Sequence, residues 1–211
     1  CFHKAAHYLG LEVVPVDVDP VTFRAHVDDA RAKMSDDVVL VVGSAPSYAH
    51  GVIDPIEELA ALAAEHGKLM HVDACVGGCV LPFMDSIEPF DFRVPGVTSI
   101  SMDLHKYGFA PKGISMLLQR TPELRVAQYY ACARWTGYGI VNSTTLGSKS
   151  AAAMGAAWAL IQHLGREGYR ERVDTMWDAT ERLVGNPAIR FEPHALFEQR
   201  SGFGAATLLE K

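Results

Sequence analysis

The chain has 211 residues, of which 49% are hydrophobic, and this is enough apolar material for the core of one α/β domain. Its net charge of −6 excludes the strongly basic surface that favours nucleic acid or anionic lipid, whereas a small charged substrate is compatible with it. No apolar run approaches the roughly 18 residues that span a bilayer, so we expect a cytoplasmic protein, or one on the cytosolic face of a membrane if an anchor precedes Cys1.

The first part of the chain alternates strand and helix patterns. Residues 13–16 form a short β-branched run that predicts a strand, and residues 21–34 place apolar side chains at helical spacing. The run 38–43 is apolar without alternation, which is typical of a strand covered on both faces in a parallel sheet. This order predicts an α/β fold with a mostly parallel sheet flanked by helices.

The next helix is predicted to begin at Asp54 and Pro55, because aspartate can cap a helix and proline suits its first position. Leu59, Leu62 and Ala63 would form its buried stripe, and Gly67 would end it.

Two further strands are predicted over residues 69–72 and 97–102. Asp73 follows the first, and Asp103, His105 and Lys106 follow the second. Open α/β sheets bind ligands at the carboxyl ends of their strands, so we expect these side chains at one rim.

The rest of the chain predicts one more strand at residues 113–118, which the short preceding loop makes antiparallel. Two helices follow, over residues 144–164 and 168–184. The segment 205–209 has the pattern of a strand that begins a further domain.

Lys106 and Asp73 suit an aldehyde cofactor of the pyridoxal phosphate type. Such a cofactor needs an amine to hold its aldehyde as an imine, and an anion to keep its ring nitrogen protonated. A cationic ring nearby also disfavours the ammonium form of the lysine. The alternatives are a surface lysine in a loop and an aspartate that caps a helix.

Other candidate residues carry weaker signals. His105 could bind a phosphate or carboxylate, move a proton, or simply be hydrogen-bonded by backbone groups. Gly147 and Ser148, placed by the pattern just inside a helix start, could offer amides and a hydroxyl to a phosphate. Lys112 and Arg134 could bind a substrate phosphate or be solvated surface charges.

Two further groups of residues have the types found in metal sites and in aromatic channels. His71, Asp73, Cys75 and Cys79 bring metal-ligand types together, but the first three alternate along one extended segment and no second pair has ligand spacing, so we predict no metal. The tyrosines at 129, 130 and 138 with Trp135 could line a substrate channel, pack in a core or form a subunit interface.

Several motifs stand in the order of a known family, and together they run from Lys4 to about Lys149. They are Lys4-Ala5-Ala6-His7-Tyr8, His50-Gly51-Val52-Ile53-Asp54-Pro55, His71-Val72-Asp73-Ala74-Cys75-Val76-Gly77-Gly78, Phe90 to Ser101, and His105-Lys106-Tyr107-Gly108-Phe109-Ala110-Pro111-Lys112-Gly113. On these motifs the chain resembles the sphingosine-1-phosphate lyase branch of the group II pyridoxal-phosphate-dependent decarboxylase family.

The resemblance implies the large domain of the aspartate-aminotransferase-like fold over residues 1–185, with residues 186–211 beginning a small C-terminal domain. It implies that the N-terminal part and most of the small domain lie outside this chain. A homodimer with shared active sites follows, whose neighbouring subunit supplies Gly147 and Ser148 to the cofactor phosphate.

Within the site, the resemblance assigns Lys106 to the cofactor aldehyde and Asp73 to the pyridine nitrogen. Catalytic roles fall to Lys106, Asp73 and His105. The other residues expected at the cofactor are Ser44, Ala74, Cys75 and His105, and those expected at the substrate are Tyr107 and Lys112.

The implied activity is cleavage of a phosphorylated long-chain amino alcohol to an aldehyde and phosphoethanolamine. Decarboxylation of an amino acid is the alternative, because both reactions would use Lys106 and Asp73. A non-catalytic homologue is a second alternative, since the stretch Asn142-Ser143-Thr144 replaces a Ser-Pro-Thr motif of the family. This loop is expected to shape the substrate entrance.

Overall fold

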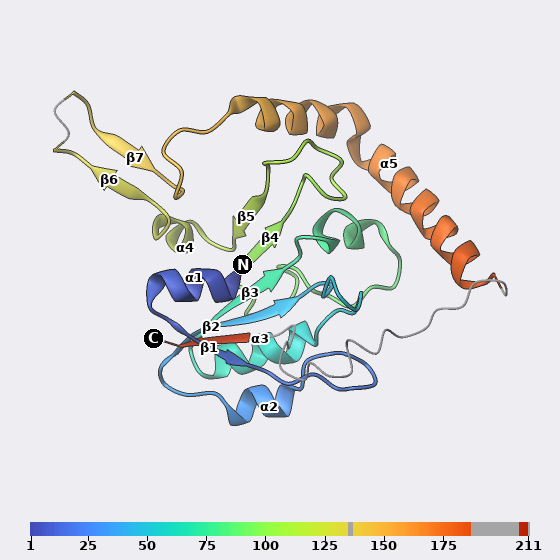
Figure 1. Ribbon diagram of the computed structural model, residues 1–211, viewed down its shortest axis with the longest axis horizontal. Coiled ribbons are helices and arrows are strands. Elements are labelled where there is room, and N and C mark those ends of the chain that lie inside the picture. Colours follow the sequence, from blue (N-terminus) through green and yellow to red (C-terminus); the bar gives the residue numbers. More distant parts are fainter. Residues whose placement is uncertain (135–136, 187–206, 211) are drawn as a thin grey trace.

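The computed structural model describes residues 1–134, 137–186 and 207–210 (Figure 1). Within these residues the main sheet has six strands in the order β1-β8-β2-β3-β4-β5. Their bounds are β1 Glu12–Pro15, β2 Val38–Ser44, β3 Leu69–Asp73, β4 Ser99–Met102, β5 Met116–Gln119 and β8 Thr207–Glu210. The five strands predicted before residue 120 are therefore confirmed, with ends displaced by up to three residues.

The sheet is mixed, with a parallel centre. β2 pairs in parallel with β3, and β3 with β4, while β5 runs antiparallel to β4 as the short connecting loop predicted. β8 runs antiparallel to both β1 and β2, so β1, β2, β3 and β4 all point in one direction. The strand expected to begin a further domain thus joins this sheet, and the division into residues 1–185 and 186–211 remains a prediction.

Helix α3 (Ile56–Glu65) covers one face of the central strands. Its predicted stripe is confirmed, because Leu59, Leu62 and Ala63 are all fully buried. Gly43 in β2 allows the close approach, since a Cβ there would lie 2.8 Å from Cδ1 of Ile56. Gly67 ends the segment at φ +66, as predicted.

The predicted capping role of Asp54 is wrong. Pro55 is the N-cap residue, and no side chain caps this helix start. The buried carboxylate of Asp54 instead accepts the amides of Ala25 at 3.1 Å and Ser44 at 2.8 Å. Two neighbouring segments supply these donors, and sequence pattern does not show them.

The helix expected over residues 21–34 is also shorter than predicted. α2 spans only Val27–Ala32 and packs on α3. The preceding residues form a turn, because the side chain of Asp19 accepts the amides of Val21 and Thr22, and Phe23 adopts φ +57. Local side-chain hydrogen bonds compete with the helix at this point.

The opposite face of the sheet holds α1 (Phe2–Leu9). Two short 3-10 turns, η1 Gly77–Cys79 and η2 Leu81–Phe83, follow β3; Leu81 packs in the same core as α3, and η2 contacts α5 (Ala151–Val184). Phe2 contacts the ring of His71 on β3, with centroids 5.4 Å apart. Side chains alternate along a strand, so His71 and Asp73 face this side while Met70 and Val72 face α3.

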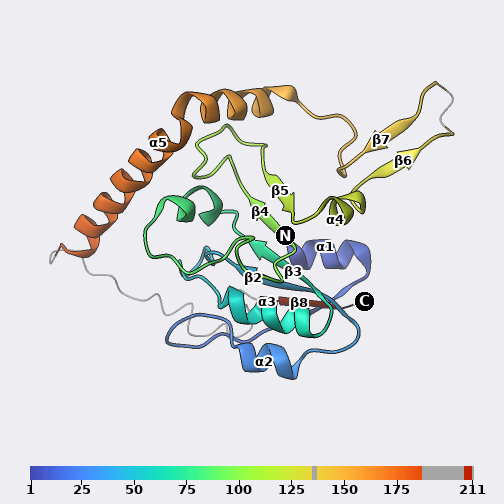
Figure 2. The ribbon, with the colours of Figure 1, turned by 180° about the vertical axis from the view of Figure 1, so that it is seen from behind.

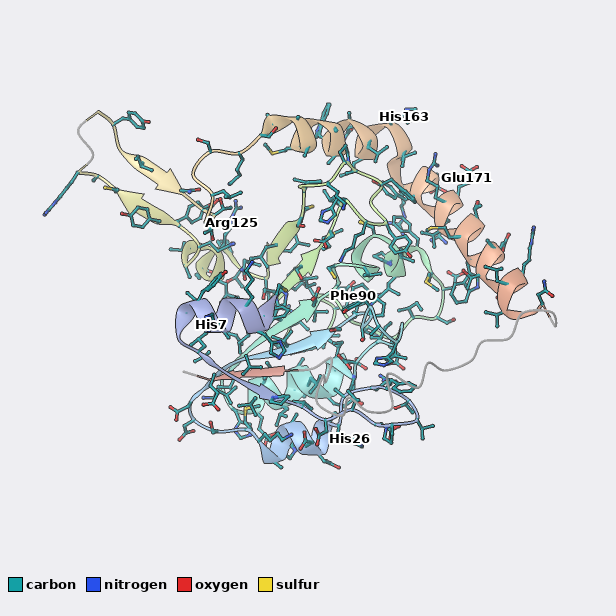
Figure 3. All side chains as sticks on the ribbon, in the orientation of Figure 1. His7, His26, Phe90, Arg125, His163 and Glu171 are labelled. Atoms are coloured by element: carbon teal, nitrogen blue, oxygen red, sulfur yellow. The ribbon has the colours of Figure 1, made fainter. Side chains whose placement is uncertain are left out.

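The C-terminal part extends away from the sheet as an arm (Figures 1 and 2). We define the arm as the hairpin of β6 (Tyr130–Cys132) and β7 (Ile140–Asn142) together with α5 (Ala151–Val184); α4 (Pro122–Val126) precedes it. On α5, His163 and Glu171 point away from the sheet (Figure 3). None of the helices in the described ranges is both long and apolar enough to cross a bilayer.

α5 combines the two helices predicted from sequence. The break between them lies at Gly165, whose φ of 58° and ψ of −170° are not helical. The helix begins at residue 151 with Ser150 as its N-cap, and not at residue 144 as predicted. The reason is a local turn, in which the amide and hydroxyl of Thr144 bond to the side chain of Asn142.

Candidate functional site

The carboxyl ends of β3 and β4 form one rigid rim. Asp73 is the last residue of β3 and pairs in register with Ser101 on β4. The loops that follow are joined by backbone hydrogen bonds from Ala74 to Ser101 (2.9 Å) and from Asp103 to Cys75 (3.2 Å). The two predicted loops therefore meet, as the parallel pairing requires.

Lys106 lies in a tight loop after β4. Its amide donates to Asp103 at 3.1 Å, and its carbonyl accepts the amide of Phe109 at 3.0 Å. The buried hydroxyl of Tyr169, on α5, donates to the carbonyl of Gly108 at 2.9 Å. A helix more than sixty residues away in sequence thus fixes the loop that carries the lysine.

Cys75 lies between Lys106 and Asp73. The Nζ atom of Lys106 is 3.1 Å from Sγ of Cys75, and the amide of Cys75 donates to Oδ1 of Asp73 at 3.1 Å. The structure therefore brings the predicted amine and carboxylate together, one on each side of a single residue.

Asp103 is a site residue to which the sequence analysis assigned no role. Its Oδ2 lies 3.0 Å from Nζ of Lys106, and its Oδ1 accepts the hydroxyl of Ser115 at 2.5 Å. The i, i+3 spacing to Lys106 could have indicated this ion pair, but only if the loop had been predicted as a turn.

Asp103 and Lys106 each favour the charged form of the other. Partial burial alone raises the pKa of Asp103, but the hydrogen bonds from Ser115 and Lys106 outweigh it, so the pKa is lowered overall. For Lys106, burial lowers the pKa, and Asp103 with Cys75 more than compensates, so the pKa is raised. A cationic ring nearby would disfavour the ammonium form of Lys106, whereas Asp103 favours that form.

The thiol of Cys75 stays protonated near neutral pH. Burial raises its pKa by more than the hydrogen bond from Lys106 lowers it. Cys75 therefore presents a neutral, polarisable surface between the lysine and the aspartate.

His105 is oriented by the backbone. Its Nδ1 atom donates to the carbonyl of Ile114 at 2.8 Å, and its Nε2 atom lies 3.8 Å from Oδ2 of Asp103. The predicted alternative, a histidine hydrogen-bonded by backbone groups, is therefore correct for its Nδ1 atom. The Nε2 atom remains on the side of Asp103, and so at the site, where it can accept a proton.

Ser44 and Ala74 lie beside the same rim. Ser44 ends β2 and pairs in register with Asp73, and the buried carboxylate of Asp54 accepts its amide. Ala74 is fully buried directly after β3. Ala74 packs in the core with the residues of α3, so it has no exposed surface at the rim. The cofactor contacts expected of Ser44 and Ala74 remain predictions.

The remaining predicted residues lie further out. Tyr107 is 41% exposed beside Lys106, and Lys112 is exposed in the loop that leads to β5. Gly147 and Ser148 are exposed in the loop between β7 and α5, on the arm and not inside a helix start. Their expected role at a neighbouring subunit remains a prediction.

The tyrosines at and beside the β6–β7 hairpin are not packed into a core of the described residues. Tyr130 is 68% exposed, Tyr138 is 71% exposed and Tyr129 is 41% exposed. Trp135 lies outside the described residues. Core packing in this chain is therefore excluded for Tyr130 and Tyr138.

The candidate metal ligands serve other contacts. His71 bonds to two serines and Asp73 accepts from Ser101 and Cys75. Across residues 1–134, 137–186 and 207–210, no group of three histidine, cysteine or acidic side chains is placed to hold a metal ion.

Comparison with known proteins identifies the family. The model of the pyridoxal-dependent decarboxylase conserved domain matches residues 1–187. The chain is 45% identical over 202 residues to a sphingosine-1-phosphate lyase of Arabidopsis thaliana, covering 93% of this chain and 36% of the relative. It is 42% identical over 176 residues to the lyase of Saccharomyces cerevisiae, covering 81% of this chain and 30% of that protein. The chain thus spans about a third of these relatives.

Solved structures agree with the fold. A sphingosine-1-phosphate lyase from Burkholderia pseudomallei superposes with a TM-score of 0.85 at 41% identity, over 89% of this chain and 44% of the other. A glutamate decarboxylase from Lactobacillus brevis shares the fold, with a TM-score of 0.78 at 23% identity, over 88% of this chain and 43% of the other.

The residues at the rim fit pyridoxal phosphate. The cofactor requires an amine for its aldehyde and an anion for its ring nitrogen, and Lys106 and Asp73, on either side of Cys75, are side chains of these two kinds. The match of sequence, fold and donor groups gives the same answer: the chain belongs to the pyridoxal-dependent decarboxylase family, and pyridoxal phosphate is its cofactor.

Proposed function

We propose that this chain serves a carbon–carbon lyase that cleaves a phosphorylated long-chain amino alcohol, of the sphingosine-1-phosphate type, into an aldehyde and phosphoethanolamine. The observation that carries the proposal is the Lys106–Cys75–Asp73 arrangement at the rim. The choice of lyase rests on identities of 39–45% to named sphingosine-1-phosphate lyases, against 23% to the glutamate decarboxylase.

Bound pyridoxal phosphate supplies an electron-accepting ring that takes up the electron pair of a bond broken at Cα of the substrate. Lys106 carries the cofactor aldehyde on its Nζ atom, and Asp103 holds that atom in place. Asp73 would hold the ring nitrogen, and Cys75, between Asp73 and Lys106, would lie against the ring. Ala74 and Ser44 complete the cofactor neighbourhood.

His105 is proposed to move a proton at its Nε2 atom. The carbonyl of Ile114 accepts the hydrogen of Nδ1, so Nε2 carries the lone pair of the neutral ring. A lyase needs a base for the C3 hydroxyl of its substrate. Support comes from Oδ2 of Asp103, which lies 3.8 Å from Nε2 of His105 and 3.0 Å from Nζ of Lys106.

Lys112 is proposed to bind the substrate phosphate, and Tyr107 to contact the substrate next to Lys106. Both side chains are exposed at the loop that carries the catalytic lysine. An ammonium group at this loop would recognise a phosphate as a point charge.

Amino acid decarboxylation is the alternative, favoured by the family model itself. The deciding experiment incubates the protein, at its full natural length, with a phosphorylated long-chain amino alcohol and separately with amino acids. Release of a long-chain aldehyde supports the lyase, and release of carbon dioxide supports the decarboxylase. Lys112→Ala should raise KM about tenfold for the phosphorylated substrate only. An equal effect on both substrates contradicts the role of Lys112.

We also propose a homodimer in which the loop of Gly147 and Ser148 reaches the cofactor phosphate of the partner subunit. The exposed apolar side chains of the arm support a partner surface. Co-expression of Lys106→Ala with Ser148→Asp tests this, because only mixed dimers would hold one intact site. Activity should return to about a quarter of the unsubstituted level. No recovery in isolated mixed dimers would contradict shared sites.

The proposed location is the cytoplasm or the cytosolic face of a membrane. Cell fractionation of the full-length protein, with protease protection of any membrane fraction, tests this. A membrane-bound protein that resists protease added from the cytosolic side would contradict the proposed location.

A further inference from the structure

Four polar side chains occupy one face of the central sheet, directly behind the rim. His71 and Asp73 alternate along β3, and Ser99 and Ser101 alternate along β4. The parallel register pairs His71 with Ser99 and Asp73 with Ser101, so the four side chains form two adjacent rows. His71 and Ser99 are buried, at 6% and 9% exposed.

These side chains form a continuous hydrogen-bonded chain. The distances are 2.8 Å from Ser99 Oγ to His71 Nδ1, 3.1 Å from His71 Nε2 to Ser101 Oγ, and 3.2 Å from Ser101 Oγ to Asp73 Oδ1. Every link lies within hydrogen-bond distance, and the last link ends on the predicted partner of the cofactor nitrogen.

The direction of each hydrogen bond follows from the carboxylate of Asp73 at the end of the chain. An ionised carboxylate only accepts, so Ser101 must give its single proton to Asp73. The oxygen of Ser101 then accepts from His71, which places the ring proton of His71 on Nε2. Burial lowers the pKa of His71, while the charge of Asp73 opposes this, and the neutral ring is favoured. Its bare Nδ1 accepts the hydroxyl of Ser99.

We propose that His71 and Ser101 are positioning residues, which hold the carboxylate of Asp73 at Oδ1 so that Oδ2 faces the pyridine nitrogen of the cofactor. Oδ1 accepts both the hydroxyl of Ser101 and the amide of Cys75. Two donors at one oxygen fix the rotation of the carboxylate. The inference rests on the cofactor role of Asp73 in the proposed function.

A chain of hydrogen bonds that all run in one direction also polarises its members toward the charge at its end. Removing the final donor should therefore weaken the hold on the cofactor by more than removing the first one. This asymmetry separates a positioning role from a general contribution to packing.

Variants of the full-length protein test the chain through the dissociation constant of pyridoxal phosphate. Ser101→Ala should raise that constant about tenfold, the change expected on losing one hydrogen bond to a charged group. Ser99→Ala, on the same face of β4, should raise it about threefold or less. Equal constants for Ser101→Ala and the unsubstituted protein would overturn the proposal.

His71 offers a conservative rescue. His71→Gln keeps an N–H donor that can reach Ser101, whereas His71→Leu removes every donor at similar volume. We expect His71→Gln to retain most of the cofactor affinity and His71→Leu to resemble Ser101→Ala. If both variants lower thermal stability equally and leave cofactor affinity unchanged, His71 is merely structural and the proposal fails.

Nitrogen NMR of 15N-histidine-labelled protein without cofactor gives an independent reading of the tautomer. The signal that disappears in His71→Gln should show protonated Nε2 and bare Nδ1 at neutral pH. Protonated Nδ1 would reverse the chain and overturn the proposal. Because this readout needs no cofactor, it decides the hydrogen-bond chain even if the unsubstituted protein failed to bind pyridoxal phosphate, a result that would instead refute the proposed function.

Discussion

The central sheet and the arm differ in how far their large apolar side chains are buried. In the sheet region, Leu59, Leu62 and Met70 are fully buried between α3 and the strands. In the arm, Tyr138, Val141 and Trp158 are each about 70% exposed, at 71%, 69% and 67%. The sheet region therefore completes its core within the described chain, whereas the arm buries Ala157, Tyr169 and Val173 of α5 and leaves most of its other large apolar side chains to water.

This difference separates two kinds of structural support. A two-stranded hairpin is only marginally stable by itself, and large exposed apolar patches usually mark an interaction surface. The rim that carries Asp73 and Lys106, by contrast, is held by strand pairing and by backbone bonds between its loops, and Tyr169 of α5 adds one hydrogen bond to the lysine loop. The candidate site thus lies on the region that has its own core, and the exposed face of the arm is the surface that we propose for a partner.

The largest expected difference is between Lys106, which follows β4, and Lys68, which precedes the neighbouring strand β3 at the opposite edge of the sheet. Lys106→Ala should abolish the absorbance of bound cofactor and lower kcat by about a thousandfold or more, because it removes the amine that holds the aldehyde. Lys68→Ala, just before β3 where its Nζ bonds the carbonyl of Asp36, should change kcat less than about twofold. Comparable losses in the two variants would contradict the assignment of the site to one rim.

The burial contrast predicts a second difference. Leu62→Ala should lower the free energy of unfolding by about 2–5 kcal/mol, since it leaves a cavity under the sheet. Trp158→Ala should change the unfolding of the separated subunit by less than about 0.5 kcal/mol and should weaken self-association instead. Chemical denaturation and analytical ultracentrifugation measure the two quantities. A large loss of subunit stability in Trp158→Ala would show that the arm is packed in the isolated chain.

Asp54→Asn tests the support of the rim itself. Each oxygen of the buried carboxylate accepts a different amide, from Ala25 and from Ser44. Asparagine offers one acceptor and turns an NH₂ group toward the other donor, so unfolding should become easier by about 2 kcal/mol. Denaturant titration measures this. An unchanged midpoint would mean that water replaces the lost acceptor.

The smallest expected effect is a pH dependence from His71. Its folded pKa is depressed by burial, so the unfolded chain binds a proton more readily than the folded one. The stability it contributes is present above about pH 6.5, the ordinary histidine pKa, and is lost as pH falls through the depressed folded value. Denaturation between pH 7 and pH 5 should therefore show less acid sensitivity in His71→Gln than in the unsubstituted protein. Identical slopes would contradict a neutral buried ring.

The position of the rim could be predicted from the sequence because each strand is recognised from the pattern of its own side chains. The continuous apolar run at residues 38–43 and the strand before Asp73 are read directly from side-chain pattern, and parallel pairing then brings Asp73 and Lys106 together. The sequence did not predict what depends on long-range contacts. The hold of Tyr169 on the lysine loop, for example, joins residues 61 positions apart.

Turn chemistry explains the wrong helix starts. Asp19 binds the amides of Val21 and Thr22, and Asn142 binds Thr144, so apolar spacing that fits a helix is overridden by side-chain hydrogen bonds. The Asp54 error has a different origin, because its partners Ala25 and Ser44 come from other segments. Helix propensity carries no information about either.

The most direct test of the account is chemical trapping of the cofactor. The full-length protein, loaded with pyridoxal phosphate, is reduced with borohydride, digested and analysed by mass spectrometry. We expect a phosphopyridoxyl group on Lys106 alone, and a cofactor absorbance that becomes weak or pH-sensitive in Asp73→Asn. A label on another lysine, or an undiminished label in the Lys106→Ala variant, would contradict the assignment of Lys106 as the residue that holds the cofactor.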